Sequence, residues 1–562
     1  MKSDVRRDER RRACASAAAM ALSSCLALVA GPLAAQEDPH ANCAAMGWVP
    51  REILARPLPL RHGVGNNSER VSTSSEEAQA FYDQGLNYLH GYVWIEAARS
   101  FNQALRHDPD LAMAYVGLSR VYSGLDDPAA AREALEAAVA RAATASPREQ
   151  RRVALRAKQL DAIDDVANPV EHEEYKRALE EALAADVDEA ELWLLAGNAQ
   201  EPTAAGRGQR GGAASTAFYH EALRFFPDNA AAHHYLTHSY ETIGQIARAL
   251  EHGEAYARGA PQIPHAHHMW GHDLRRVGRI DDAIAAFTRS DELERAYYEA
   301  ERIPPGLDWH HVHNLDLLAT AYQHKGRVRR AEELLKDAAS LPPVTEYQEY
   351  NHRQLTAFYL SRGRWEQALS AARSLQSGKW ASTRAVGHAF AGHALLASGR
   401  VAEARAALAQ AQAALTEVTT VPAGITPKQG GVRPYVETLA AELLLRTGDR
   451  AEGHALMKDV ARALRAVPGP DAWIQALFRI ESMAAIARAA GDWPLAEHLA
   501  RELIDHDAAY GGSHLALALV ALERGDRATT ERELDAAAFH WRDADPDLPE
   551  LQAIRSRRAS SP

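Results

Sequence analysis

Two short stretches carry histidines at a spacing that suits a metal ion. In AAHHYLTHSYE, His234 and His238 lie four residues apart, and Glu241 follows three residues later. In PHAHHMWGHD, His268 and His272 repeat the same spacing. Residues four apart share one face of an α-helix, so each pair would point to one side. Imidazole nitrogens with a nearby carboxylate favour Zn, Cu(II) or Fe over Ca or Mg, and the lack of thiol ligands disfavours Cu(I) and iron–sulfur clusters.

The elements that would position these pairs belong to a repeated pattern. In AQAFYDQGLNYLHGYVWIEAARSFNQALRHDPDL, small residues stand at positions 8 and 20, large residues at 11 and 24, and proline at 32. Small residues let two helices approach closely, large ones fill the space between them, and proline ends the second helix. The spacing G-x-x-x-x-A recurs as GQIARA, GRIDDA, GRVRRA, GRWEQA, GRVAEA and GDWPLA. This pattern resembles the tetratricopeptide repeat (TPR), a pair of antiparallel helices of about 34 residues.

The resemblance implies an all-α protein, a TPR superhelix (α-solenoid) of about twelve helix-pair repeats. The repeats begin near 78, 112, 156, 190, 230, 264, 312, 349, 385, 434, 477 and 511. Three stretches interrupt the period: AAGRGQRGG, ELERAYYEAERIPPGLDWHH and TEVTTVPAGITPKQGGVRP. The last of these could divide the solenoid into a His-rich part at 78–424 and C-terminal TPR-like repeats at 425–545.

The resemblance also implies where the histidines point. The first helix of each TPR lines a concave groove, and positions 2, 5, 9, 12 and 13 of the repeat face it. Both histidine pairs occupy positions 5 and 9 of adjacent repeats. Packed helices lie about 8–10 Å apart, so imidazoles of neighbouring first helices can meet at one ion. We therefore predict one groove pocket made of His234, His238, His268 and His272, joined by Glu241 or Glu201 at position 12 and by His313 at position 2.

A narrower resemblance involves three stretches in successive repeats. HHYLTHSYE, HAHHMWGHDLRRVGR and VHNLDLL are similar to the H-x-x-x-H, H-M-P-x-H and H-N signatures of a group of exported bacterial TPR proteins. Trp270 stands where that group usually has proline. The resemblance implies no defined activity. Asn314, in the H-N signature, is expected to hold the helix start or to orient a ligand.

The insertion at 297–311 is expected to lie over the groove as a lid. Its Pro304–Pro305 pair cannot continue a helix, yet it leads directly into His313. We interpret His310 and His311 as residues of a solvated loop at the end of this insertion, with part of a lid as the alternative.

The N-terminus resembles an export signal. Residues 1–35 combine an arginine-rich start with an apolar run of small residues, and 36–77 reads as an irregular N-terminal arm. We expect a periplasmic or secreted protein without a transmembrane segment after cleavage. A lipoprotein attached at Cys25 is the alternative. With residues 1–35 removed, Cys43 would be the one cysteine of the mature chain, which excludes an internal disulfide. Residues 546–562 are expected to form a disordered tail.

Charge and missing motifs exclude several functions. The chain has a net charge of −12, which disfavours nucleic acid as a partner. It contains no HExxH, CxxCH, GxSxG or P-loop motif. Common zinc-protease, covalent-haem, serine-hydrolase and P-loop NTPase signatures are therefore absent.

Three functions remain open. The first is an exported TPR protein whose His-rich groove site binds a divalent transition metal and holds a peptide, protein or small-molecule ligand. The second is an enzyme that uses Zn, Cu or Fe at the same site, with Glu241 or Glu201 as the general base. The third is a metal-free periplasmic scaffold for protein–protein interaction.

Overall fold

The structure is a computed structural model, and the residues it describes fall within one unit of the chain, residues 38–562. The described residues are 49–165, 168–202, 204–419, 429–467, 470–552 and 554. The expected signal peptide at 1–35 and Cys43 lie outside them, as does the boundary expected at 424–425.

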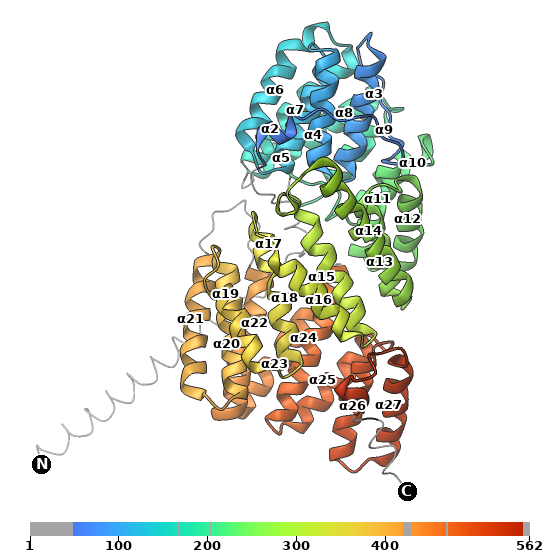
Figure 1. The fold of residues 1–562 in the computed structure, drawn as a ribbon. Helices are drawn as coiled ribbons and strands as arrows, with labels where there is room; N and C mark the ends of the chain where they lie inside the picture. Colours follow the sequence, from blue (N-terminus) through green and yellow to red (C-terminus); the bar gives the residue numbers. More distant parts are fainter. Residues whose placement is uncertain are drawn as a thin grey trace, which may run out of the picture. The chain divides into compact units, whose positions relative to one another are not determined.

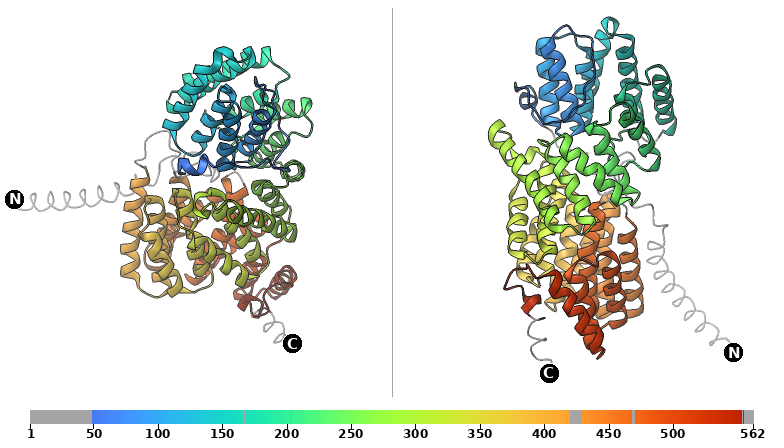
Figure 2. Two further views of the ribbon diagram at one scale, coloured as in Figure 1. Left: turned by 45° about the horizontal axis from the view of Figure 1, so that its top comes forward. Right: turned by 90° about the vertical axis from the view of Figure 1, so that its right-hand side faces the viewer.

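Within the described residues, twelve antiparallel helix pairs follow one another along the chain and no β-strand occurs (Figure 1, Figure 2). The pairs are α3 (Glu76–His90) with α4 (Trp94–His107), α5 (Ala112–Gly124) with α6 (Pro128–Arg141), α7 (Pro147–Asp164) with α8 (Pro169–Ala185), α9 (Ala190–Asn198) with α10 (Ala213–Phe225), α11 (Ala230–Thr242) with α12 (Ile246–Gly259), α13 (Pro264–Arg276) with α14 (Ile280–Glu301), α15 (Trp309–His324) with α16 (Val328–Ser340), α17 (Glu346–Asn351) and α18 (Arg353–Ser361) with α19 (Trp365–Gln376), α20 (Ala381–Ala397) with α21 (Val401–Thr419), α22 (Gln429–Thr447) with α23 (Arg450–Ala466), α24 (Pro470–Ala489) with α25 (Trp493–His506), and α26 (Gly511–Glu523) with α27 (Arg527–His540). The predicted all-α superhelix of TPR type is confirmed.

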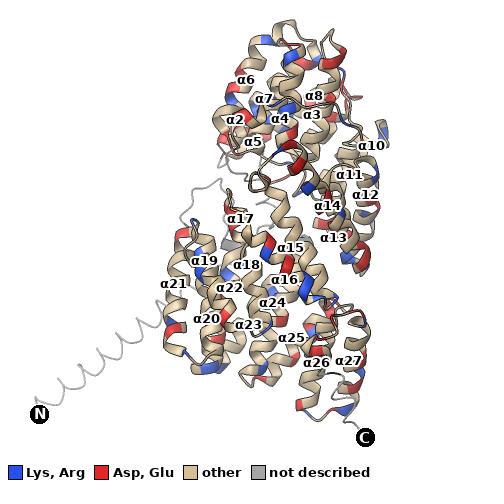
Figure 3. Ribbon diagram, viewed as in Figure 1, with Lys and Arg blue, Asp and Glu red and all other residues tan. Residues whose placement is uncertain are grey.

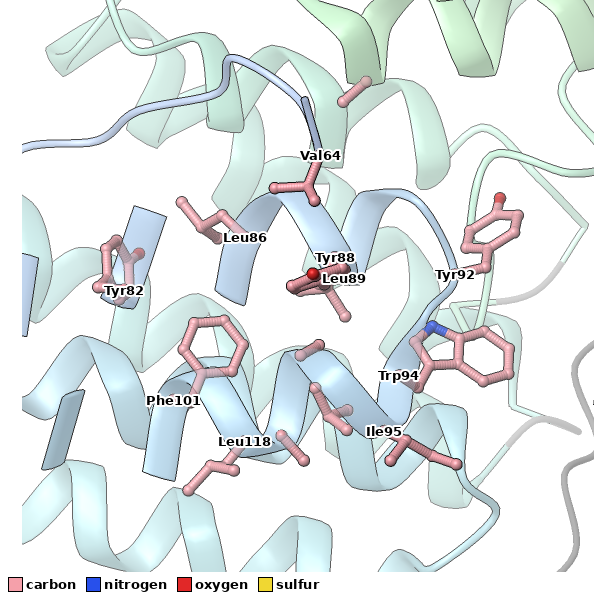
Figure 4. Close-up of a cluster of buried hydrophobic side chains, with 14 of the residues drawn as sticks. Val64, Tyr82, Leu86, Tyr88, Leu89, Tyr92, Trp94, Ile95, Phe101 and Leu118 are labelled. Atoms are coloured by element: carbon pink, nitrogen blue, oxygen red, sulfur yellow. The ribbon is translucent and has the colours of Figure 1, made fainter. Parts of the chain in front are cut away.

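The residue pattern of the first repeat explains how its helices pack. Phe101 of α4 is fully buried and lies in one cluster with Tyr82, Leu86 and Leu118 (Figure 4). A Cβ atom at Gly85 of α3 would lie 2.6 Å from the Phe101 ring, so only glycine leaves room for it. The small residue at position 8 and the large residue at position 24 thus fit one against the other.

The turn between paired helices explains the recurring glycine. Gly278 has a φ of +79°, a left-handed conformation that glycine adopts without steric strain. It ends α13, and the backbone N–H of Arg279 then donates to the carbonyl of Leu274. The chain reverses within three residues, and α14 begins at Ile280.

Several repeats begin earlier than the sequence count predicted. Helix α7 begins at Pro147 rather than near residue 156, because Ser146 caps it in a capping box with Glu149. Helices α20, α22 and α24 begin at 381, 429 and 470, before the predicted 385, 434 and 477. All four helices have 17 to 20 residues, so counting back one standard repeat from the turn placed their starts too late.

The described part of the N-terminal arm follows the surface of the repeats. Its one helix in this part is α2 (Arg51–Leu54), and the remainder is irregular. Asn67 and Asn87 exchange two hydrogen bonds between the arm and α3, at 2.8 and 3.0 Å. The arm is thus held to the first repeat at Asn67.

The segment expected to be a disordered tail is ordered in its described part. Leu548, Leu551 and Ile554 are buried in the core cluster that begins at Leu274. The short 3₁₀ helices η2 (Ala142–Thr144) and η3 (Pro305–Leu307) complete the elements of the described chain. Among the described residues, none of the helices has the length and apolar character needed to cross a membrane.

Candidate metal centre

Three successive first helices carry the histidines of the candidate site. The Asn229 side chain accepts a hydrogen bond at the start of α11, Pro264 occupies the first turn of α13, and Asp308 caps α15. Helices α11 and α13 contact each other, as do α13 and α15. Their facing sides are therefore close enough to share ligands, and the histidines on them are buried rather than exposed in an open groove.

The first histidine group, here called the first triad, consists of His234, His238 and His265. Their candidate ligand atoms all lie within 4.8 Å of one another. The Nδ1 atom of His234 lies 2.7 Å from the backbone carbonyl of His90, so Nδ1–H donates there and Nε2 is left for the site. Neither ring nitrogen of His265 has a hydrogen-bond partner within the described part of the chain, although the side chain is buried.

The second triad consists of His268, His272 and His313, whose candidate ligand atoms also lie within 4.8 Å of one another. The Asn314 side-chain oxygen lies 3.0 Å from Nδ1 of His268, and no described residue offers a hydrogen-bond partner to Nε2 of that ring. Asn314 is itself held by its amide, which donates to the Phe287 carbonyl at 3.0 Å. Such a support fixes the orientation and tautomer of a ligand histidine.

Glu241 lies between the two triads. Its Oε2 is 3.9 Å from Nδ1 of His238, and its Oε1 is 3.6 Å from Nδ1 of His272. The triads also approach each other directly, because the rings of His265 and His268 are 5.6 Å apart between centroids. One carboxylate thus contacts an imidazole of each triad.

Burial keeps the imidazoles in the form that binds metal. It lowers the pKa of His234 to about 3, against the small opposing effect of the His90 carbonyl. Burial, followed by the charges of neighbouring histidines, also holds the pKa values of His265 and His268 well below the ordinary value. These rings are neutral at pH 7, and neutral imidazole is a metal ligand whereas imidazolium is not.

The structure divides the predicted histidines between two adjacent triads, and Glu241 contacts both. His265, which the sequence reasoning missed, completes the first triad. It stands at position 2 of its repeat, the same groove position as His313 in the next repeat, so the repeat phase contained the signal. A divided site follows from the spacing of the helices, since α13 contributes side chains toward both of its neighbours.

Glu201 does not join either triad. Its two carboxylate oxygens accept hydrogen bonds from the backbone N–H groups of Arg207 and Arg210, at 3.3 and 3.1 Å. Burial raises the pKa of Glu201 to about 7, and these backbone donors oppose that rise. Glu201 thus holds the glycine-rich loop after α9, and the proposal that it acts as a base at the metal is withdrawn.

His310 and His311 are buried in the first turn of α15 and do not form a solvated loop. The ring of His310 contacts Glu294, and Nε2 of His311 lies 3.0 Å from Asp291. Asp291, Glu294 and His311 also form a compact ligand group. Burial opposes protonation of His311, but Asp291 and Glu294 outweigh it and raise the pKa of His311. The two carboxylates are already paired with His310 and His311, so this group is explained as polar support for α15.

A cavity of about 470 Å³ adjoins the first triad. Here it is called the access cavity, and its walls include Arg61, Tyr92, His265, Tyr297, Trp309 and His310. Trp309 stacks on Trp94 with ring centroids 5.8 Å apart, and its ring lies 5.9 Å from that of His265. The insertion expected to be a lid therefore forms one wall of a cavity that reaches a triad histidine.

The geometry suits metal chemistry with an open coordination position. Three imidazoles supply three of the four ligands of a tetrahedral ion, as in catalytic zinc sites, and leave one position for water or a ligand. Imidazole is also a good ligand for Cu and Fe. Glu241 is close enough to both triads to support or bridge ions bound there.

The comparisons with known proteins identify the repeat but not the site. Residues 112–144 match the model of the tetratricopeptide repeat family. The solved structure of yeast Tom70 shares 12% identity over 86% of this chain and 95% of its own, with a TM-score of 0.31. PilW, a type IV pilus biogenesis factor, shares 17% identity over 49% of this chain and 98% of its own, with a TM-score of 0.25. Scores this low support no further structural argument, and no curated protein matches the chain significantly. The chain is thus an all-α protein of helix-pair repeats, one of which, at residues 112–144, matches the tetratricopeptide repeat family.

Proposed function

We propose that this protein binds transition-metal ions in its two histidine triads and presents them to a small ligand that enters the access cavity. The observation that carries this proposal is the pair of buried three-histidine groups on adjacent first helices, with Glu241 in contact with both. Burying six imidazoles at this density is costly unless they are paired or bind metal. The donor set favours Zn, Cu(II) or Fe.

Catalysis is the second candidate function, and the access cavity favours it. The cavity brings a molecule to His265, and a three-histidine site has an open position for water or substrate. A bound ion would polarise a ligand or activate water there, and Glu241 is the one remaining candidate for a base.

A metal-free scaffold for protein or peptide partners is the third candidate, which the TPR-type fold favours by itself. We retain export to the periplasm as part of the proposal. Lys and Arg are interspersed with Asp and Glu along the helices, a distribution that disfavours nucleic acid (Figure 3).

Metal titration of the full chain tests the proposal. Protein freed of metal with EDTA should bind about two Zn²⁺ or Co²⁺ ions per chain, and bound Co²⁺ should give the intense visible absorption of a tetrahedral site. Changing both His238 and His272 to Ala should remove both ions while the far-UV spectrum still shows helix. A matched control with His107→Ala, at an exposed position on α4, should keep both. Folded protein that takes up no metal leaves the scaffold as the function.

A further inference from the structure

The access cavity has an acidic and aromatic lining that the metal proposal does not explain. Glu96 of α4 and Glu294 of α14 both line it, and their side chains are almost fully buried. The Oε2 atom of each has no hydrogen-bond partner among the described residues. A buried carboxylate oxygen without a donor is costly, so each points to a missing hydrogen-bond donor.

Tyr297 connects the helices that carry the two carboxylates. Glu294 and Tyr297 are three residues apart on α14 and therefore share a helix face. The Tyr297 hydroxyl donates to Oε1 of Glu96 at 3.1 Å. The tyrosine thus links the wall that carries Glu294 to the one that carries Glu96.

The nearby arginines neutralise this wall only in part, because Arg99 contacts Glu96 but no arginine pairs with Glu294 among the described residues. Arg99 pairs with Glu96 and also with Glu301, and Arg61 pairs with Glu301 as well. Asp308, a further carboxylate at the cavity, accepts a hydrogen bond from Tyr298. Burial, with help from Asp308 and Asp291, raises the pKa of Glu294 well above its ordinary value, against the opposing charge of His311. The surroundings therefore favour either a proton or an added cation at Glu294.

The remaining walls suit an organic cation. Tyr88, Tyr92, Tyr297 and Trp309 all line the cavity. Aromatic faces attract ammonium groups, and a primary ammonium has three N–H donors for carboxylate acceptors. An anion would meet the carboxylates of Glu96 and Glu294, and the two arginines described beside them, Arg61 and Arg99, already pair with Glu301. A volume of about 470 Å³ is within the range of small-molecule sites.

We infer that the access cavity binds a small primary amine in its protonated form, with the ammonium at the Glu96–Glu294 wall and the body of the molecule among the aromatic rings. The inference rests on the proposed function in one respect: the same cavity would bring the amine to the first triad. The structure thus assigns the cavity a ligand class, an organic cation with an apolar or aromatic body.

Calorimetric titration with three matched probes tests this assignment. The probes are phenethylamine, its neutral analogue 2-phenylethanol and its anionic analogue 3-phenylpropionate. Phenethylamine should bind at least about tenfold more tightly than 2-phenylethanol, and 3-phenylpropionate should not bind measurably. Equal binding of the alcohol or the carboxylate, or no binding of the amine, overturns the inference.

Two variants, Glu294→Gln and Glu96→Gln, test where the amine binds, and Glu292→Gln is their control. Glu294→Gln keeps the shape of the side chain and should weaken phenethylamine binding by about tenfold or more. Glu292→Gln, at an exposed position on the same helix, should leave it unchanged. Glu96→Gln serves as a second test if the first variant fails to fold. Unchanged amine affinity in folded Glu294→Gln and Glu96→Gln proteins contradicts the assignment.

The titrations are run on EDTA-treated and Zn²⁺-loaded protein, with zinc content measured in each sample. Protein that holds zinc but not phenethylamine contradicts this inference and leaves the metal proposal standing. Protein that binds the amine but no zinc contradicts the metal proposal and supports the assignment of the cavity.

Discussion

The Nε2 atoms of His234 and His238 lie 3.1 Å apart inside the protein. Because Nδ1–H of His234 donates to the His90 carbonyl, Nε2 of the neutral ring is an acceptor, and Nε2 of His238 must be the donor. Two nitrogens that bind one tetrahedral ion at about 2.0–2.1 Å are themselves roughly 3.3 Å apart. The rings therefore already have the spacing of two ligands. For Nε2 of His238 to bind a metal ion, the ring must carry its proton on Nδ1, and Glu241 lies 3.9 Å from that atom.

Glu241→Gln should weaken metal binding at both triads. The carboxylate contacts an imidazole of each, and loss of such a supporting charge typically reduces metal affinity about 10–100-fold. Competition titration of Zn²⁺ against a chelator would measure the affinity of each of the two Zn²⁺-binding steps, one per triad. Glu251→Gln, at an exposed position on α12, is the control and should behave as wild type. If only one step changes, Glu241 does not serve both triads.

Asn314→Leu should weaken binding at the second triad alone. It removes the acceptor for Nδ1–H of His268 and releases that ring to rotate. An affinity loss of about 10–100-fold in one of two Zn²⁺ steps is expected. Asn314→Asp keeps an acceptor and should recover part of the loss. Equal weakening of both steps would instead indicate a general disturbance of α15.

The metal-free protein should lose stability as the pH falls below about 6.5. A histidine in the unfolded chain titrates near that value, whereas burial lowers the pKa of His234 to about 3 in the folded state. Between these values the unfolded state binds more protons, so the free energy of unfolding decreases with falling pH. The slope is up to about 1.4 kcal/mol per pH unit for each such histidine.

Urea unfolding of EDTA-treated protein at pH 7.5 and 5.0 would measure this slope. His234→Gln removes one titrating group and should flatten the dependence. His107→Gln, an exposed change, should not. Equal slopes in wild type and His234→Gln would show that His234 is not held neutral by burial.

Gly85→Ala should destabilise the first repeat despite the higher helix propensity of alanine. The added Cβ would lie 2.6 Å from the Phe101 ring, and overpacking of this kind costs about 1–3 kcal/mol. The gain in propensity offsets about 1 kcal/mol of that. Gly259→Ala, where the nearest atom would be 3.5 Å away, is the control and should be neutral or stabilising in urea unfolding. A Gly85→Ala protein as stable as wild type would contradict the close packing at this position.

The repeat phase allowed the fold to be predicted because it depends on short-range rules. Small residues at positions 8 and 20 and glycine at the turn specify a helix pair wherever they occur, as at Gly85 and Gly278. Helix starts were less predictable, because they depend on local caps such as Ser146 and on helices longer than the standard repeat. The burial of Leu548 in the described part of the tail could not be predicted, because its core cluster includes residues as distant in sequence as Leu274.

The sequence predicted which repeat positions carry the site's histidines, but not which of these histidines lie together. Positions 5 and 9 do face one interior, yet which imidazoles meet depends on the distances between three helices. The same limit explains Glu201. It stands at the expected position of its repeat, but its carboxylate oxygens accept hydrogen bonds from the loop that follows it. The pairing of His310 with Glu294 across the insertion has no local signature in the sequence.

Anomalous diffraction from crystals of the zinc-loaded protein tests the central claim most directly. Data collected on either side of the zinc absorption edge place each ion without reference to the protein coordinates. The account predicts one peak at about 2.0–2.1 Å from nitrogens of His268, His272 and His313, and a second at the same distance from nitrogens of His234, His238 and His265. Zinc found only at surface residues, or none in well-ordered crystals, would contradict it.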